Sequence, residues 1–205
     1  QVQDGWENGW GHGFAAERDG TIEQFAMAVS MYSSNIDDHV WASSDSQVLK
    51  TLGADSAGID GKINASLQSF DSDGFTLDYG KVDEGQPALY MAVDTEAEAE
   101  VGYAKTPTST GPQTINTDIG LESVSLIGSN TISDIDSEKL VGPNDADAHH
   151  GWMHGGGTVE DQRAMGFSSH SDSVNGHASG SSKTNAFHLL YTDKDGNIKG
   201  RDKAR

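Results

Sequence analysis

The stretch Ser69-Phe-Asp-Ser-Asp-Gly-Phe-Thr-Leu-Asp-Tyr-Gly80 decides the fold class that this sequence predicts. Phe75, Leu77 and Tyr79 alternate with polar residues, which is the period-two pattern of a strand with one buried face. The pair Asp73-Gly74 just before them is typical of a tight turn in which a glycine adopts positive φ. We therefore expect a β-hairpin at the centre of an all-β domain.

Strand-like patterns extend along most of the chain. Residues 88–93 (Ala-Leu-Tyr-Met-Ala-Val) are a continuous apolar run, which predicts a strand covered on both faces, although periodicity alone also fits a buried helical turn. Residues 21–32 alternate in a way that favours a strand, although alanine and methionine are also good helix formers. Further strands are predicted at residues 40–52, as two strands about a Ser-Ser-Asp-Ser turn, and at residues 62–69 and 121–128.

The composition agrees with an all-β chain and argues against a membrane span and against nucleic acid as a partner. The 205 residues include 25 glycines and are only 34% hydrophobic, which favours short strands and turns over long helices. No apolar run of about 18 residues is present that would cross a membrane. The formal net charge is −19, and the acidic residues are spread along the chain. This charge argues against nucleic-acid binding, which requires basic surface to release counterions.

The same negative charge indicates a protein adapted to high salinity. Repulsion between the acidic groups would destabilise a compact fold at low ionic strength. In molar salt the Debye length falls to about 3 Å, and this repulsion is largely screened. An ordinary acidic extracellular or virion protein is the alternative explanation. The chain contains no cysteine, so no disulfide contributes to its stability.

The second half of the chain repeats the first. Gly9-Trp-Gly-His-Gly13 reappears as Gly151-Trp-Met-His-Gly155, and Gln24-Phe-Ala-Met27 reappears as Gln162-Arg-Ala-Met165. From Gln24 onwards the matches keep a constant offset of 138 positions, as far as His39 and its counterpart His177. Matches in one register over this length indicate an internal duplication.

The repeat predicts a first unit at residues 1–105, a linker rich in Pro and Thr at 106–118, and a second unit at 119–205. The predicted fold is all-β, with duplicated antiparallel β-sandwich units of jelly-roll or lectin-like type. The first unit lacks an opening strand like residues 121–128, and the second lacks a closing hairpin. Either the chain is a window of a longer protein, or neighbouring subunits supply strands to open sheet edges.

One module of the sequence resembles known proteins. Ser69-Phe-Asp-Ser-Asp-Gly-Phe-Thr-Leu77, followed by Leu89-Tyr-Met-Ala92, resembles a module of tail-fibre and other structural proteins of tailed viruses. The continuation through Val101-Gly-Tyr103 is similar too, whereas Ile119-Gly-Leu121 departs from the usual Gly-Phe-x-Pro of that family. The resemblance implies a β-sandwich in a virion component, with structural rather than catalytic motifs. Together with the acidic composition it suggests a tailed virus of a halophilic archaeon. Over one strand, the hairpin also resembles the sandwich of H-type lectins.

Histidines and paired carboxylates are the candidate metal ligands. His149, His150 and His154 are close in sequence, and imidazole is the commonest transition-metal ligand. No predicted helix fixes their geometry, however, and histidines in Gly-rich loops are more often solvated. Asp71 and Asp73 belong to an Asp-x-Asp-Gly sequence of the kind that binds Ca²⁺, but turn formation explains it equally and no closing Glu follows. We therefore predict no cofactor and keep Ca²⁺ or a transition metal as the alternative at these residues.

The repeated aromatic residues are the candidate binding residues. Trp10, His12, Trp152 and His154 occupy equivalent positions in the two copies, and exposed tryptophan rings can stack on sugars. The alternative is that Trp10 and Trp152 pack their loops onto the sandwich. No catalytic residue is predicted, because no serine lies in a Gly-x-Ser-x-Gly sequence and any of the 32 acidic residues would fit a glycosidase pair.

We expect a non-enzymatic structural protein exposed on the virion of a tailed virus that works at high salt. It would assemble through its sheet edges with copies of itself, as a trimer or larger symmetric oligomer, and with other virion proteins. One alternative is host recognition, in which loops near Trp10 and Trp152 bind cell-surface glycan or the S-layer. Another is a tail-associated hydrolase, which would need a concave pocket with convergent carboxylates or histidines.

Overall fold

Every regular element of the described structure is a β-strand. The computed structural model describes residues 6–33, 37–55, 58–82, 88–93, 98–105, 113–129, 135–136, 138–141, 149–158, 160–170, 177–182, 187–192 and 198–204. All strand pairs in these ranges are antiparallel, so the predicted all-β class is confirmed. Within them, no helix has the length and apolarity needed to cross a membrane.

The described strands number thirteen and follow one another along the whole chain. They are β1 (Trp6–Arg18), β2 (Thr21–Ser33), β3 (Asp37–Ser44), β4 (Leu49–Asp55), β5 (Gly58–Asp71), β6 (Gly74–Val82), β7 (Ser123–Ser129), β8 (Glu138–Val141), β9 (His149–Thr158), β10 (Gln162–His170), β11 (His177–Ser182), β12 (Phe187–Thr192) and β13 (Ile198–Ala204). The strands expected at residues 21–32, 40–52, 62–69 and 121–128 are therefore all present, with small shifts at their ends.

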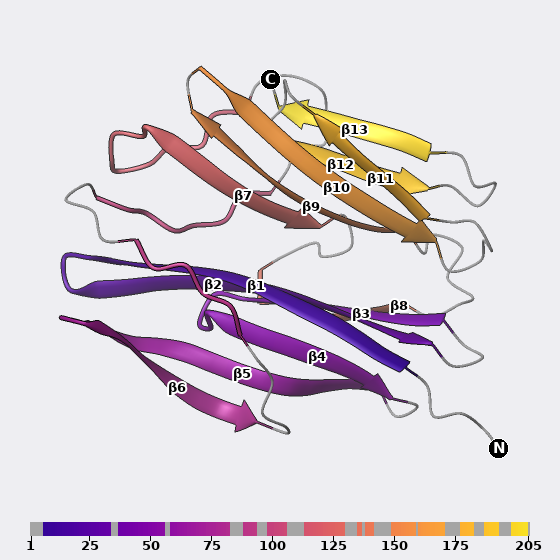
Figure 1. Ribbon diagram of the computed structural model, residues 1–205, viewed down its shortest axis with the longest axis horizontal. Coiled ribbons are helices and arrows are strands. Elements are labelled where there is room, and N and C mark those ends of the chain that lie inside the picture. Colours follow the sequence, from indigo (N-terminus) through magenta and orange to yellow (C-terminus); the bar gives the residue numbers. More distant parts are fainter. Residues whose placement is uncertain are drawn as a thin grey trace.

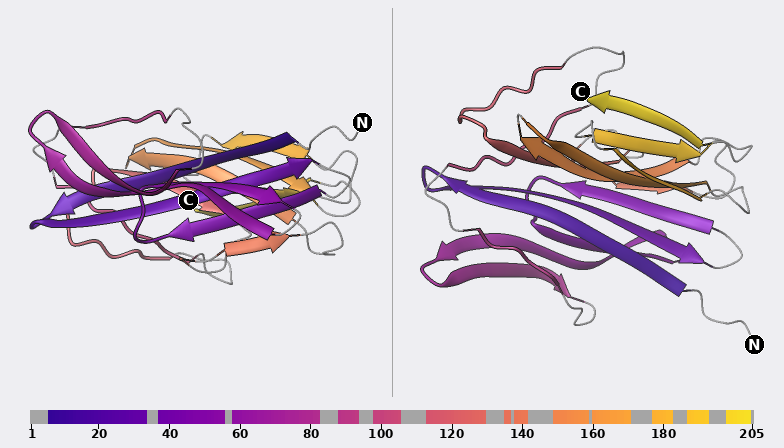
Figure 2. Two further views of the ribbon diagram at one scale, coloured as in Figure 1. Left: turned by 90° about the horizontal axis from the view of Figure 1, so that it is seen from below. Right: turned by 45° about the horizontal axis from the view of Figure 1, so that its top comes forward.

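The strands form four stacked layers (Figures 1 and 2). Sheet A has the order β1-β2-β3-β8, sheet B β4-β5-β6, and sheet C β11-β10-β9-β7, while β12 and β13 form sheet D. β4 packs on β1, β2 and β3 from one side, and β12 packs in the same way on β9, β10 and β11. Sheets A and C therefore face each other in the middle of the molecule, with sheets B and D outside them.

The long hairpin β1–β2 is closed by a two-residue turn. Asp19 and Gly20 both have positive φ, 51° and 74°, which is the pattern of a type I′ turn. The turn sets the register Trp10↔Val29 and His12↔Met27 along the hairpin. Because side chains alternate between faces, the large residues of both strands share one face and the small residues share the other.

The small face of the hairpin lets β4 approach very closely. A Cβ atom added to Gly11 would lie 1.9 Å from the carbonyl oxygen of Lys50, and one added to Gly13 would lie 1.8 Å from that of Val48. The residues opposite these glycines in β2 are Ala28 and Ala26, and both are buried. Sheets A and B thus pack through glycine and alanine, with the β4 backbone in direct contact with β1.

Gln24 connects sheet A to sheet B at an irregular point of β5. The β5–β6 register shifts between Leu67 and Ser69, which disturbs the ladder of hydrogen bonds there. The backbone N–H of Leu67 donates to Gln24 Oε1 at 2.8 Å, and Gln24 Nε2 donates to the Leu67 carbonyl at 3.4 Å. One amide side chain therefore satisfies both backbone groups of a buried residue.

Residues that match in the sequence repeat also match in strand pairing. His12 pairs with Met27 in the first half, and their counterparts His154 and Met165 pair in the second. Further along, Ala26 pairs with Ser44 and Ala164 pairs with Ser182, again at equivalent positions. The two halves therefore build β1-β2-β3 and β9-β10-β11 in one register, which agrees with an internal duplication.

Two sequence expectations about the Gly-rich and apolar stretches are wrong. The two Gly-Trp-x-His-Gly stretches are not loops, because they lie inside β1 and β9. Residues 88–93 are not a covered strand: they have no regular structure, and Leu89 is fully exposed. The glycines of the first stretch suggest a loop, but Gly11 and Gly13 instead allow the backbone at Lys50 and Val48 to approach a strand. The apolar run suits a strand, but periodicity does not show whether a surface is available to cover it.

The hairpin expected at the centre of the domain lies at its periphery. β5 and β6 do pair, but β6 forms the outer edge of sheet B and most of its residues are exposed. The turn consists of Ser72 and Asp73, and Gly74 pairs with Asp71 without adopting positive φ. The hairpin is therefore a cover on sheet A rather than its core.

We expect Gly11→Ala to destabilise the protein by about 1–3 kcal/mol, because the added methyl group would force the β4 backbone away from β1. Gly80→Ala is the matched control, since no atom lies within 4 Å of a Cβ added there. It should change the free energy of unfolding by no more than about 0.5 kcal/mol. Urea unfolding at fixed salt measures both, and equal effects at the two positions would contradict the close packing of β4.

Candidate functional site

The four residues that the sequence predicts as a binding site lie together between sheets A and C. Trp10 and His12 come from β1, and Trp152 and His154 come from β9; we call them the ring cluster. The Trp10 and Trp152 ring centroids are 4.5 Å apart with an interplanar angle of 79°, and those of His12 and His154 are 5.1 Å apart at 72°. Trp152 also contacts His154, with centroids 6.2 Å apart.

The alternation of β1 and β9 explains why these rings meet. In each strand the tryptophan and the histidine are two positions apart, so they lie on the same face. Like pairs with like across the gap: tryptophan contacts tryptophan, and histidine contacts histidine. The two copies of the sequence motif therefore form one inter-sheet contact rather than two separate sites.

Two apolar residues that sequence analysis did not single out complete the cluster. Val29 of β2 is buried and packs with Trp152 and Trp10. Phe14 of β1 extends the row of rings, with its centroid 5.0 Å from that of His12. Phe14 was detectable in the sequence, because it continues the alternation that begins at Trp10. Val29 was not, since its partner lies in the other half of the chain.

The electrostatics of the cluster favour a neutral His12 imidazole. Burial lowers the pKa of His12 below its ordinary value of 6.5, and the nearby His154 lowers it further. A hydrogen bond of 3.3 Å joins Ser125 Oγ of β7 to His154 Nε2. Protonation of both imidazoles would place two like charges side by side between the sheets.

This geometry favours packing over ligand binding as the role of the ring cluster. A sugar-stacking platform needs an exposed ring face. Trp152 is only 9% exposed, and its ring lies against Trp10 and His154. The edge-to-face ring contacts hold sheets A and C together.

The candidate metal ligands are not brought together in the described structure. Asp71 belongs to the β5–β6 hairpin, where its carboxylate accepts hydrogen bonds from Ser69 Oγ at 3.0 Å and Thr76 Oγ1 at 2.9 Å. Asp73 is exposed in the turn. The side chains of His149 and His150 lie outside the described residues. Among the residues that are described, no group of three or more His, Cys, Asp or Glu side chains converges on a point.

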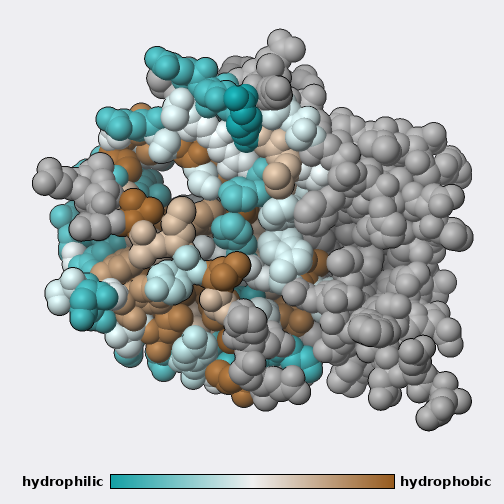
Figure 3. Space-filling view, in the orientation of Figure 1, coloured by the Kyte–Doolittle hydropathy of each residue, from teal (hydrophilic) through white to brown (hydrophobic). Residues whose placement is uncertain are grey.

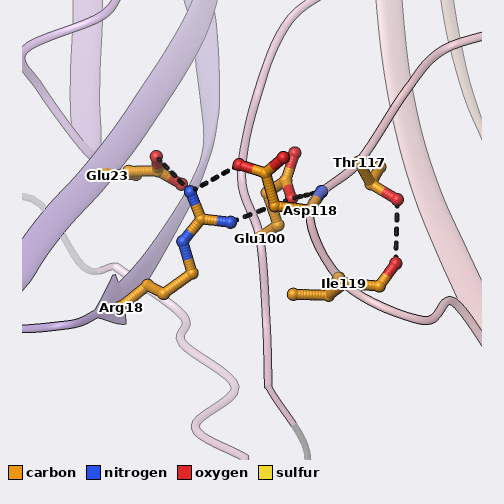
Figure 4. A network of polar contacts seen from close by, with 6 residues as sticks. All are labelled: Arg18, Glu23, Glu100, Thr117, Asp118 and Ile119. Carbon is orange, nitrogen blue, oxygen red and sulfur yellow. Dashed lines mark hydrogen bonds and ion pairs between the residues drawn. The ribbon is translucent and has the colours of Figure 1, made fainter.

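An ion-pair network that the sequence did not reveal ties the irregular segments to sheet A (Figure 4). Arg18, at the end of β1, contacts Glu100 at 3.3 Å, Asp118 at 3.2 Å and Glu23 at 3.9 Å. The backbone N–H of Asp118 donates to Glu100 Oε2 at 2.8 Å. Residues 98–105 and 113–120 are thus joined to the β1–β2 turn and to each other. A single cation balances three carboxylates at this point.

We expect the free energy of unfolding to fall as the pH drops below 6.5. The pKa of His12 is lower in the folded than in the unfolded protein. The unfolded state therefore binds more protons in this range, and stability is lost as the pH falls through the lowered pKa. His12→Phe should remove this part of the pH dependence. Urea unfolding in molar salt on both sides of pH 6.5 measures it, and an unchanged acid loss in the variant would refute it.

The ring pair should be energetically coupled. Trp152→Ala should cost about 3–5 kcal/mol of stability, because a large side chain is removed from a buried site. In a double-mutant cycle with Trp10→Ala, a coupling of about 0.5–1.5 kcal/mol is expected for an edge-to-face contact. Leu121→Ala, at an apolar residue that is 50% exposed, serves as the control and should have little effect. A coupling of zero between the tryptophans would show that sheets A and C do not meet through them.

Comparison of the chain with protein-family models, with curated proteins and with solved structures finds no match. No family membership is therefore assigned. The function proposed below rests on the chain's own residues and on the resemblance of residues 69–77 and 89–92 described above.

Proposed function

We propose that this chain is a structural, non-enzymatic protein of the virion surface of a tailed virus, adapted to high salt. It works by assembling through sheet edges with copies of itself and with other virion proteins. The observation that carries the proposal is a set of open sheet edges beside exposed apolar side chains. An edge strand presents unpaired backbone N–H and C=O groups, which are a template for pairing with another chain.

The open edges belong to long strands. β1 has 13 residues and β6 has 9, and each ends its sheet in the described structure. β6 exposes Tyr79 and Val82 by about half, and β7, at the end of sheet C, exposes Val124. Monomeric proteins usually protect such edges with short strands, prolines or lysines. Long edges with apolar side chains support a protein whose sheets continue into neighbouring subunits.

The charge supports a salt-dependent setting for this assembly. With a formal net charge of −19, two copies of the chain repel each other unless the ionic strength is high. Residues 98–105, which carry two of the four glutamates or aspartates between 94 and 100, remain close to the surface of sheet A through Arg18. The placement in a tailed virus rests on the resemblance of the hairpin sequence.

We expect the purified chain to form a stable oligomer at about molar salt and to dissociate or unfold near 0.1 M, since screening of charge repulsion changes most over this range. Light scattering gives the mass in solution at each salt concentration, and circular dichroism separates dissociation from unfolding. A folded monomer at both salt concentrations would refute assembly as the function.

A further inference from the structure

The outer edge of β1 corresponds to an edge that is covered in the other half of the chain. β1 and β9 are equivalent in the repeat and pair with β2 and β10 in the same register. On its other side β9 pairs with β7, from Ser123↔Thr158 to Ser129↔Trp152. Among the described residues β1 has no such second partner and ends sheet A. Sheet A therefore lacks, beside β1, a strand that sheet C has beside β9.

Met165 marks the surface that such a strand would cover. It lies in β10, between β9 and β11, and pairs with His154, whose ring contacts His12 of sheet A. Paired residues share a face, so Met165 lies on the face of sheet C that is turned toward sheet A. In Figure 1, β10 is drawn in front of β9 and β1 in front of β2. A strand added in front of β1 would thus lie beneath β10.

The exposure of Met165 shows that this surface is uncovered. Met165 is 57% exposed, although it belongs to an inner strand and to an inward face. Its counterpart Met27, which faces the same inter-sheet space from β2, is half-buried. The two methionines occupy equivalent positions in the repeat, so the difference comes from what lies opposite them. Sheet A ends before it reaches Met165.

The chain also carries an apolar segment whose large side chains are exposed in the described structure. In residues 88–93, Leu89 is 102% exposed, Met91 88%, Tyr90 76% and Val93 68%. This segment lies in no described strand, and the Tyr90 ring contacts that of Phe75 in β6, with the ring centroids 5.2 Å apart. Figure 3 shows apolar residues exposed at several places on the described part of this face. Six consecutive apolar residues at a protein surface indicate a binding segment.

Part of this segment matches the sequence of sheet A. Met91-Ala92-Val93 repeats Met27-Ala28-Val29, the centre of β2. In sheet A large side chains face sheet C and small ones face β4, because the β4 backbone leaves no room for more. A strand with Leu89, Met91 and Val93 toward sheet C would place Ala88, Tyr90 and Ala92 on the opposite face, so two of the three residues on the side of β4 are small.

We propose that the outer edge of β1 binds residues 88–93 of a second copy of this chain as an added strand, with Met91 and its neighbours covering Met165. The inference rests on the proposed assembly function and names the two surfaces that carry it. The donor segment and the acceptor edge are different parts of the molecule, so the contact is head-to-tail. Such contacts build rings when the rotation closes and filaments when it does not.

Two substitutions and their mixture test the proposal by light scattering at about molar salt, over a series of protein concentrations. Met91→Asp disables the donor and Met165→Asp the acceptor, since each would bury an unpaired carboxylate in the contact. Both residues are exposed in the single chain, so each variant should keep its fold. We expect each to associate at least about tenfold more weakly than the unchanged protein, which corresponds to 1.4 kcal/mol.

The mixture is the sharper test. An equimolar mixture of the two variants contains one intact donor and one intact acceptor, so it should form 1:1 dimers and nothing larger. Ile115→Asp is the matched control, because Ile115 is equally exposed and belongs to neither surface. It should associate like the unchanged protein.

The possible failures are distinct. Association that persists in both variants, or that is lost in only one of them, overturns the docking of residues 88–93 on β1 and leaves assembly as the function. A single-chain mass for the unchanged protein, at every concentration and salt, overturns both proposals. If that monomer protects the amides of residues 88–93 from hydrogen exchange, the segment has bound within its own chain instead.

Discussion

The contact between the β4 backbone and the glycines of β1 is the constraint on which the rest of the structure depends. It leaves room only for hydrogen or methyl groups on one face of sheet A, which is why Gly11 and Gly13 face Ala28 and Ala26. All the bulk of the β1–β2 hairpin must then lie on the opposite face. That face holds Trp10, His12 and Phe14 beside Phe25, Met27 and Val29, and it is the face that sheet C covers. One close approach between backbones therefore decides which side of the hairpin becomes the inter-sheet core.

Because this packing uses small residues, the buried core is small, and the stability of the fold is sensitive to repulsion between its charges. Among the described residues that are fully buried, the largest is Met153, followed by serines. Alanines make up much of the remaining apolar core, and each buries little surface. Against this modest gain stands a net charge of −19, whose self-repulsion depends on ionic strength. The ring cluster and the Arg18 network act at the two places where separate parts of the chain must be held together, between the sheets and at the irregular segments.

The sequence predicted local structure better than it predicted layers. Alternation located β2, β6 and β7, and the repeat linked Trp10 with Trp152 and His12 with His154, which proved to be in contact. It did not show that residues 9–13 belong to a strand, because Gly11 and Gly13 are needed for the close approach of Lys50 and Val48, which are distant in the sequence. Nor did it show that residues 88–93 are exposed. An apolar run indicates that burying these residues would be favourable. Whether a surface is available to cover them depends on how the sheets are arranged.

The two halves of the chain are most informative where equivalent positions differ. Met27 and Met165 share a register, a residue type and an inward direction, so neither propensity nor composition can explain why only one is covered. What differs is the next layer, since sheet C continues past β9 into β7 while sheet A ends at β1. The pairing of β9 with β7 shows how the edge of β1 can be extended, because β1 is the equivalent strand and has no such partner among the described strands. Residues 91–93 repeat the large-small-large order of Met27-Ala28-Val29, so the order of side chains that packs the centre of β2 also occurs in the segment proposed to extend the edge of sheet A.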